Sequence, residues 1–147
     1  MIRSIHEYVE ARAREYDAIA LDIWEHPEVS GREERSSAIH RDRLSAEGFE
    51  IEEFPEMAYS FVARKGEGRP VIAIMGEYDA LPGMSQACST VREARVPGGA
   101  GHACGHNLLG MGSLAAAEAL AAALLQAGLP GTVRYYEIGR ASCRERG

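Results

Sequence analysis

The first 24 residues have the apolar spacing of a helix. The side chains that share one face are Ile5, Val9, Tyr16, Ile19, Ala20 and Ile23. This spacing is typical of an amphipathic helix, and His26-Pro27 ends the run because a residue before proline avoids the helical conformation. A second helix is expected from about Arg32 to Ala46, with Gly48 suited to its C-terminal cap.

Both helices are preceded by a sequence typical of a capping box. The first pairs Ser4 with Glu7, and the second pairs Ser30 with Glu33. In such a box a side-chain acceptor and an acid three residues later satisfy free backbone N–H groups. We therefore predict that the two helices begin at these residues.

The middle of the chain has shorter apolar runs that predict strands. Phe49 with Ile51, and YSFVA at 59–63, indicate two short, half-exposed strands. PVIAIM at 70–75 is apolar throughout, a pattern typical of a strand covered on both faces, so we expect it at the centre of a mostly parallel sheet. The loop that follows, at about 82–101, is long enough to predict a functional or mobile segment.

The last regular segments are an alanine- and leucine-rich helix, expected from about Asn107 to Gln126, and a strand, TVRYY, at 132–136. Together with the apolar run at 70–75 they predict a β-α-β unit and hence an α/β sandwich. The helix is apolar enough to suggest a membrane span. Glu118, Gln126 and the many alanines favour a packed core helix instead.

Composition narrows the class of protein. The 147 residues, 46% of them apolar, are enough for one domain with a sizeable core. The formal charge of -6 argues against a nucleic-acid partner. The start of the chain lacks the apolar region of a secretory signal, so we expect a cytoplasmic protein. Cys88, Cys104 and Cys143 are odd in number and unevenly spaced, which argues against a disulfide framework.

Two groups of residues could perform chemistry. Glu77 and Asp79 directly follow the apolar run at 70–75, at the end of the sheet where α/β proteins bind ligands. Their i, i+2 spacing would project both carboxylates toward one side if the chain stays extended. A pair of solvated turn acids would have the same sequence, and both interpretations remain open at this point.

The second group is His102, Cys104 and His106, in the loop before the alanine-rich helix. The positive end of a helix lowers the pKa of a thiol, and zinc binds thiolate and imidazole readily. The alternative is a small buried cysteine between surface histidines. The remaining histidines, His6, His26 and His40, are expected to be solvated, and Cys88 is expected to have no function.

Taken together, three segments resemble one family. GEYDALPGMSQ, GHACGHNLLGMGSLAAA and GTVRYY, in this order and spacing, are similar to the zinc-dependent amidohydrolases and peptidases that include aminoacylase and carboxypeptidase-like enzymes. Within the family, the likeness is to the branch that holds the second subunit of aminobenzoyl-glutamate hydrolase. It also covers the opening helices from about Ile5. It implies a three-layer α/β/α sandwich, of which this chain would be the amino-terminal part of the catalytic domain.

The resemblance also implies an activity and roles for the site residues. The expected reaction is hydrolysis of an amide in an N-acyl amino acid, aminobenzoyl-glutamate or a dipeptide-like substrate. Two divalent metal ions would be needed, zinc first, with manganese or cobalt as alternatives. Cys104, as a bridging ligand, and His106 match the metal ligands of this branch. Asp79 matches an aspartate that orients a ligand histidine, and Glu77 stands where the wider family has a ligand histidine. His102 fits the pattern without an assigned role.

The family places its catalytic glutamate shortly after the strand that matches TVRYY, behind a Gly-Cys-Pro segment. Here Tyr136 is followed by EIGRASCRERG, most of which matches a translated sequencing adapter. We therefore expect residues 1–136 to be the amino-terminal portion of a metallohydrolase domain and residues 137–147 to be a non-native tail in which Cys143 has no function. Such a fragment would lack the catalytic base and be inactive alone.

Two other functions are compatible with the same residues. One is a thiol hydrolase with Cys104 as nucleophile and His102 or His106 as base. The other is a non-catalytic metal-binding module. For the hydrolase, the expected partner is a small amide or dipeptide substrate, with no nucleic acid or membrane. A complete form could be a homodimer.

Overall fold

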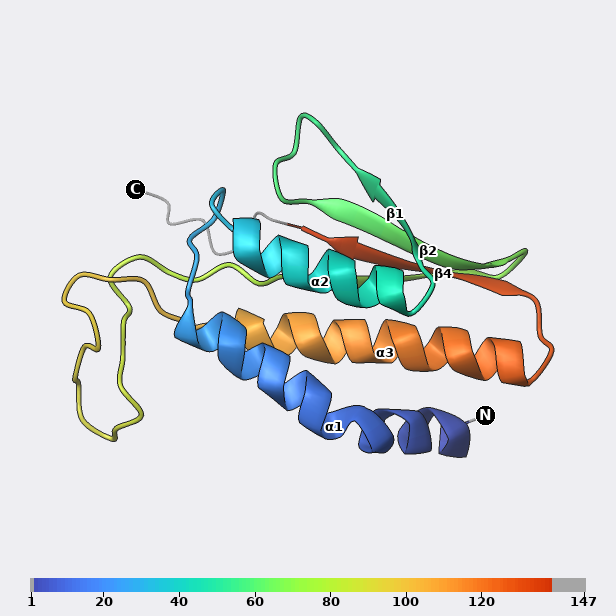
Figure 1. Cartoon of the computed structure of the whole chain (residues 1–147), viewed down its shortest axis with the longest axis horizontal. Coiled ribbons are helices and arrows are strands. Elements are labelled where there is room, and N and C mark those ends of the chain that lie inside the picture. Colours follow the sequence, from blue (N-terminus) through green and yellow to red (C-terminus); the bar gives the residue numbers. More distant parts are fainter. Residues whose placement is uncertain (1, 139–147) are drawn as a thin grey trace.

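The computed structural model describes residues 2–138, and these form three helices and one four-stranded sheet (Figure 1). In chain order the elements are α1 (Ile2–Glu25), α2 (Glu34–Ala46), β1 (Glu50–Glu53), β2 (Phe61–Glu67), β3 (Val71–Gly76), α3 (His106–Gln126) and β4 (Gly131–Glu137). The predicted helices and strands are therefore all present. Cys143 and most of the proposed tail lie outside the described residues.

The strands lie in the order β1-β2-β4-β3. β3 and β4 are parallel and are joined through α3, which confirms the predicted β-α-β unit. The expectation that residues 70–75 form a central strand is wrong for the described sheet, because β4 pairs with both β2 and β3 and leaves β3 at the edge. Val71 and Met75 are 52% and 64% exposed because their side chains lie on the face of the sheet away from the helices, whereas Ile74, on the opposite face of β3, packs against the core.

All three helices lie on one side of the sheet (Figure 1). α3 packs on β3 and β4, α2 packs beside it near β1, and α1 packs on the outer side of α3. The core between the sheet and the helices contains Phe61, Ala63, Val133 and Tyr135 from the strands and Leu44 and Leu114 from the helices. The α/β class is confirmed, and residues 2–138 supply the sheet and one helical layer of the sandwich.

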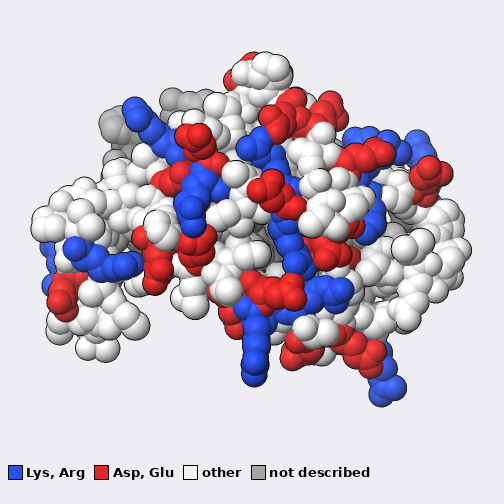
Figure 2. All heavy atoms as spheres, viewed as in Figure 1, with Lys and Arg blue, Asp and Glu red and all other residues white. Residues whose placement is uncertain are grey.

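The long apolar helix α3 lies between α1 and the sheet. By length and composition alone it could cross a membrane, but its buried residues include Leu114, Ala117 and Ala121, which pack in the core. The structure therefore places it as the core helix that its sequence favoured. On the face shown in Figure 2, basic side chains alternate with acidic ones, and no broad area of that face is purely basic.

The two predicted capping boxes are not the helix starts. α1 already includes Ile2, so Ser4 lies inside the helix. α2 begins at Glu34, and its N-cap residue Glu33 makes no side-chain capping bond. Glu28 performs this role instead: its carboxylate accepts hydrogen bonds from the backbone N–H groups of Arg35 at 2.9 Å and Ser36 at 2.8 Å. A more distant acid thus replaces the expected local cap.

A buried carboxylate on α3 joins the three helices. Glu118 is 2% exposed and accepts a hydrogen bond from the Tyr16 hydroxyl of α1 at 2.7 Å. The guanidinium of Arg43 on α2 donates to both Glu118 oxygens, at 2.9 and 3.0 Å. Because the Glu118 carboxylate is buried away from water, its negative charge must be compensated by Tyr16 and Arg43.

Replacing Glu118 by glutamine is expected to lower the free energy of unfolding by about 2 kcal/mol, since Arg43 loses its buried counter-ion and keeps only the more exposed carboxylates of Glu15 and Glu47. Glu10→Gln, at an exposed position of α1, is the matched control and should change stability by less than about 0.5 kcal/mol. Urea unfolding followed by circular dichroism measures both. Equal midpoints for the two variants would show that Glu118 does not join the helices.

The last strand extends one residue beyond the predicted domain boundary. Glu137 pairs with Phe61 in the β2–β4 ladder and is 2% exposed. The first residue assigned to the tail is thus a buried strand residue, and the proposed junction at 136–137 falls inside β4.

Candidate metal centre

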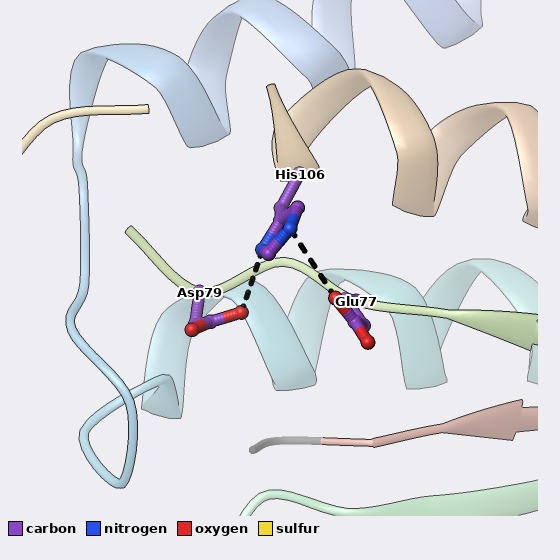
Figure 3. A group of neighbouring side chains, drawn as sticks. All are labelled: Glu77, Asp79 and His106. Atoms are coloured by element: carbon purple, nitrogen blue, oxygen red, sulfur yellow. Dashed lines mark hydrogen bonds and ion pairs between the residues drawn. The ribbon is translucent and has the colours of Figure 1, made fainter. Parts of the chain in front are cut away.

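Three of the predicted residues meet at the carboxyl end of β3 (Figure 3). Glu77 and Asp79 follow the last residue of the strand, and His106 is the first residue of α3. One donor atom from each lies within 4.8 Å of the other two. The two sequence motifs, which are 27 residues apart, therefore form one cluster.

Asp79 and Glu77 contact different nitrogens of the His106 ring. Asp79 Oδ1 lies 2.8 Å from Nδ1, and Glu77 Oε2 lies 3.3 Å from Nε2. A carboxylate can only accept, so Nδ1 carries a proton and, in the neutral ring, Nε2 presents its lone pair toward Glu77. Two acceptors facing each other are stable only with a cation or a proton between them.

This donor set fits a divalent metal ion. A separation of 3.3 Å between His106 Nε2 and Glu77 Oε2 is what two ligands sharing one ion at bond lengths of about 2.0 to 2.2 Å would show. Imidazole nitrogen with carboxylate oxygen suits zinc, and also manganese or cobalt. Asp79, 4% exposed, contacts the far nitrogen of the ring, the position of a group that orients a ligand histidine.

Backbone contacts hold the Glu77–Asp79 segment. Ala80 N–H donates to the Glu28 carbonyl at 2.7 Å, which ties the segment to the turn before α2. On the other side α3 lies against it directly, because a Cβ built at Gly110 would be 2.7 Å from the Glu77 carbonyl oxygen. The site thus depends on close packing between the start of α3 and the end of β3.

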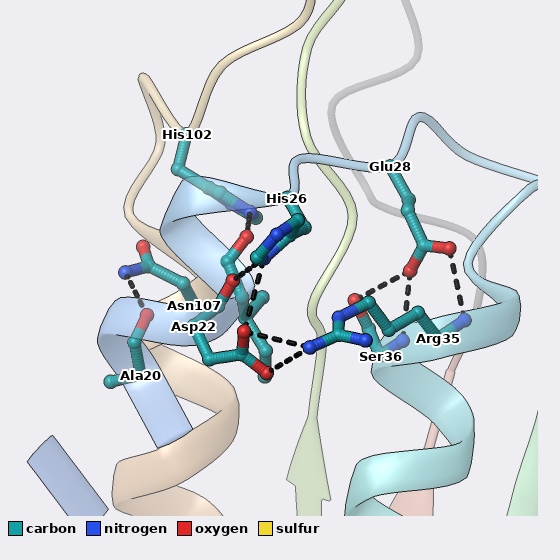
Figure 4. A network of polar contacts seen from close by, with 9 residues as sticks. Ala20, Asp22, His26, Glu28, Arg35, Ser36, His102 and Asn107 are labelled. Atoms are coloured by element: carbon teal, nitrogen blue, oxygen red, sulfur yellow. Dashed lines mark hydrogen bonds and ion pairs between the residues drawn. The ribbon is translucent and has the colours of Figure 1, made fainter. Parts of the chain in front are cut away.

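His102 lies four residues before His106 in the chain and is held by the end of α1 (Figure 4). Its Nε2 donates to the Ile23 carbonyl at 3.2 Å, since a carbonyl can only accept. Burial lowers the pKa of His102 below its usual value, so the ring is kept neutral. Asn107, on the first turn of α3, donates in the same way to the Ala20 carbonyl at 3.1 Å. The last turns of α1 therefore fix both sides of the motif.

Cys104 is exposed in the turn before α3, and its Sγ is not part of the cluster of three donors. Its role as a metal ligand stays a prediction. Cys88, in the loop at 82–101, is also exposed.

Comparisons with known proteins relate the chain to metal-dependent hydrolases. No family model matches. The chain is 43% identical over 136 residues to one of the subunits of p-aminobenzoyl-glutamate hydrolase from Escherichia coli, covering 91% of this chain and 28% of that protein. It is 36% identical over 120 residues to N-acetylcysteine deacetylase of Bacillus subtilis, covering 78% and 30%.

A solved structure agrees with these relatives. A dinuclear metal-binding peptidase of the M20 family from Bacillus subtilis superposes with a TM-score of 0.67 at 34% identity, over 87% of this chain and 35% of that one. The chain belongs to this family of amidohydrolases and peptidases. It spans about a third of the length of each of these proteins. The family resemblance seen in the sequence is thereby confirmed.

Sequence reasoning missed two buried groups of this family member, the first of which is His40. The expectation that it is solvated is wrong: it is 0% exposed, and its Nδ1 lies 3.1 Å from the Tyr135 hydroxyl and 3.3 Å from Glu137 Oε2. Its neighbours hid this, because the buried face of α2 consists of Ser36, Ser37, His40 and Leu44. Small polar residues at helical spacing were the available signal.

The second missed group is Glu33, which is 0% exposed and has no hydrogen bond of normal geometry to either carboxylate oxygen. Burial raises its pKa to about 7, the charge of Asp79 adds to the rise, and backbone N–H groups at 31–33 oppose it. Between the unfolded value of 4.5 and about 7, the folded state binds more protons than the unfolded state. Stability attributable to Glu33 is therefore full below pH 4.5 and is lost as the pH rises to 7.

Replacing Glu33 by glutamine is expected to remove the loss of folding stability that accompanies the rise in pH. The variant should gain about 2 to 3 kcal/mol of stability over the parent at about pH 8 and little at about pH 4.5. Thermal melts of both proteins across this range measure the difference, with the exposed Glu34→Gln as control. A constant gap between parent and variant at all pH values would contradict the raised pKa.

Proposed function

We propose that this chain carries half of the metal centre of a hydrolase that cleaves the amide bond of an N-acyl amino acid, aminobenzoyl-glutamate or dipeptide-like substrate. The observation that carries the proposal is the His106 ring, fixed by Asp79 at 2.8 Å and facing Glu77 at 3.3 Å. The names of the relatives, a p-aminobenzoyl-glutamate hydrolase and an N-acetylcysteine deacetylase, support amide hydrolysis.

His106, Glu77 and Cys104 are the residues that would hold a metal ion. A bound divalent metal ion would polarise the substrate carbonyl and lower the pKa of a coordinated water. A pair of ions agrees with the dinuclear peptidase, and we propose zinc as the first candidate. Asp79 accepts the Nδ1 proton of His106 and so keeps the Nε2 lone pair available. The positive end of α3 favours the Cys104 thiolate.

We further propose that a longer protein completes the site. The base that takes a proton from water in this family is one glutamate of a Glu-Glu pair behind a Gly-Cys-Pro segment, and neither the pair nor the segment occurs after Tyr136. On this proposal residues 137–147 are non-native, the 147-residue chain is inactive alone, and the complete enzyme is cytoplasmic and a homodimer.

The thiol-hydrolase alternative gains no support from the site. Either histidine would have to serve as base for Cys104, but one ring nitrogen of His102 is engaged with Ile23 and one of His106 with Asp79. The other nitrogen of His102 is buried, and that of His106 faces Glu77.

The test begins with resequencing the gene across the codon for Tyr136. We expect the frame to continue into a Gly-Cys-Pro-like segment with two glutamates. The product of the complete frame should release glutamate from N-(4-aminobenzoyl)-L-glutamate or deacetylate an N-acetyl amino acid, and a chelator should stop it. Activity that persists in chelator, or a complete product that has no glutamate pair and no amidase activity, would overturn the proposal.

A further inference from the structure

A cavity separate from the cluster of three donors lies between the end of α1 and the loop at 82–101. Its volume is about 900 Å³, and its walls include Trp24 and Glu25 from α1, Arg92 and Arg95 from the loop, and His102. This volume lies in the range of small-molecule sites. The cavity is therefore large enough for a compact organic ligand.

The loop that forms the cavity is held by hydrogen bonds across it. Ser85 N–H donates to the Gly99 carbonyl at 3.0 Å, and Ala87 N–H donates to the Glu93 carbonyl at 2.7 Å. The Gln86 side chain adds a bond to the Val91 carbonyl at 2.8 Å. These contacts give the cavity a defined wall, as expected of a preformed site.

Charge and shape in the cavity favour an anion with a flat apolar part. The guanidinium carbon of Arg95 lies 4.7 Å from the centre of the Trp24 ring, a stacking contact that leaves the N–H groups at its edge available. Arg92 and Arg95 form no hydrogen bond or ion pair with any of residues 2–138, whereas many other arginines of the chain do. Glu25 is the one acid in the wall, against these two cations.

The cavity adjoins the metal centre. His102 and Ala103 belong to its wall and directly precede Cys104. The backbone ties this wall to the cluster, because the N–H of Gly105, directly before His106, donates to the His102 carbonyl at 3.3 Å. A molecule whose amide lies at the cluster could therefore extend an acidic group into the cavity.

We infer that this cavity is the subsite for the carboxylate-bearing part of the amide substrate, with Arg95 as the carboxylate-binding residue and Trp24 as the apolar wall. The inference rests on the proposed function for the identity of the ligand as an amide. Binding in the cavity requires only that the ligand be an acidic acyl amino acid, whether or not its amide is cleaved. The reason is that a guanidinium binds a carboxylate through paired N–H groups. A neutral amide should bind poorly.

The test uses the 147-residue chain and N-benzoyl-L-glutamate, with neutral N-benzoylglycinamide as the comparison probe. Trp24 is the chain's one tryptophan, so its fluorescence reports on the cavity wall. We expect saturable quenching by the acidic probe and at least tenfold weaker binding of the neutral one. Arg95→Gln should weaken binding of the acid at least tenfold, and Arg14→Gln, on α1 and outside the cavity wall, should leave it unchanged.

Binding is measured with and without zinc, which separates this inference from the proposed function. Loss of acid binding in Arg95→Gln with unchanged zinc binding supports the subsite. Equal binding in Arg95→Gln and Arg14→Gln, or equal binding of the two probes, overturns the subsite and leaves the metal centre untouched. Acid binding in a chain that fails to bind zinc would retain the subsite and contradict the hydrolase proposal.

Discussion

Replacing Gly110 by alanine is expected to lower the free energy of unfolding by about 3 kcal/mol, although alanine favours helices more than glycine does. The added Cβ would lie 2.7 Å from the Glu77 carbonyl oxygen and 3.1 Å from His40 Cε1. The first contact is with backbone and the second is with a fully buried ring, so neither neighbour can move aside without disrupting close packing. α3 must therefore move away from the end of β3, which also separates His106 from Glu77.

Gly112, two residues further along α3, provides the matched control. A Cβ there meets nothing within 4 Å, so Gly112→Ala should stabilise the chain by about 0.5 to 1 kcal/mol. Urea unfolding of the two variants gives the comparison, and zinc titration of the folded Gly110→Ala protein reports the effect on the site. Similar stabilities for the two variants would show that the contact between α3 and Glu77 does not hold the site together.

Replacing His106 by alanine is expected to weaken zinc binding by at least about 100-fold, because the variant loses a ligand that the fold has already oriented. Asp79→Asn should have a smaller effect, about 10- to 100-fold, since it changes only the group that fixes the ring. Competition with a chromophoric chelator measures both affinities. His26→Ala, at an exposed position just after α1, should bind zinc as the parent does.

The order of these effects distinguishes the assigned roles. If Asp79→Asn weakens binding as much as His106→Ala, then Asp79 is itself a ligand. If His26→Ala weakens zinc binding as much as His106→Ala does, the chain binds zinc through surface histidines and the proposed centre is wrong.

The helices and the β-α-β unit could be predicted because their apolar periodicity is local. The end of α1 at His26-Pro27 and the cap at Gly48 were visible in the sequence for the same reason. Strand order was not, since an apolar run such as 70–75 has the same composition whether a strand lies at the centre or at the edge. Glu28 could not be identified as the cap of α2, because it precedes the helix by more residues than a capping box allows.

Only the part of the site that belongs to local sequence motifs could be predicted. Glu77, Asp79 and His106 belong to motifs whose place relative to a strand and a helix could be inferred. Glu33 and His40 belong to no motif, and only the packing of α2 and of the turn before it reveals that they are buried. The cavity beside Trp24 depends on the path of a loop without periodicity, which no sequence pattern specifies.

Metal binding by the chain itself tests the central claim most directly. Zinc is titrated into the reduced 147-residue protein by calorimetry, and cobalt is titrated in parallel because its absorption reports thiolate coordination. We predict one saturable site per chain that His106→Ala removes, with a thiolate signal that disappears in Cys104→Ser. A chain that binds neither metal saturably, or that binds them equally well without His106, would contradict the assignment of this cluster as a metal centre.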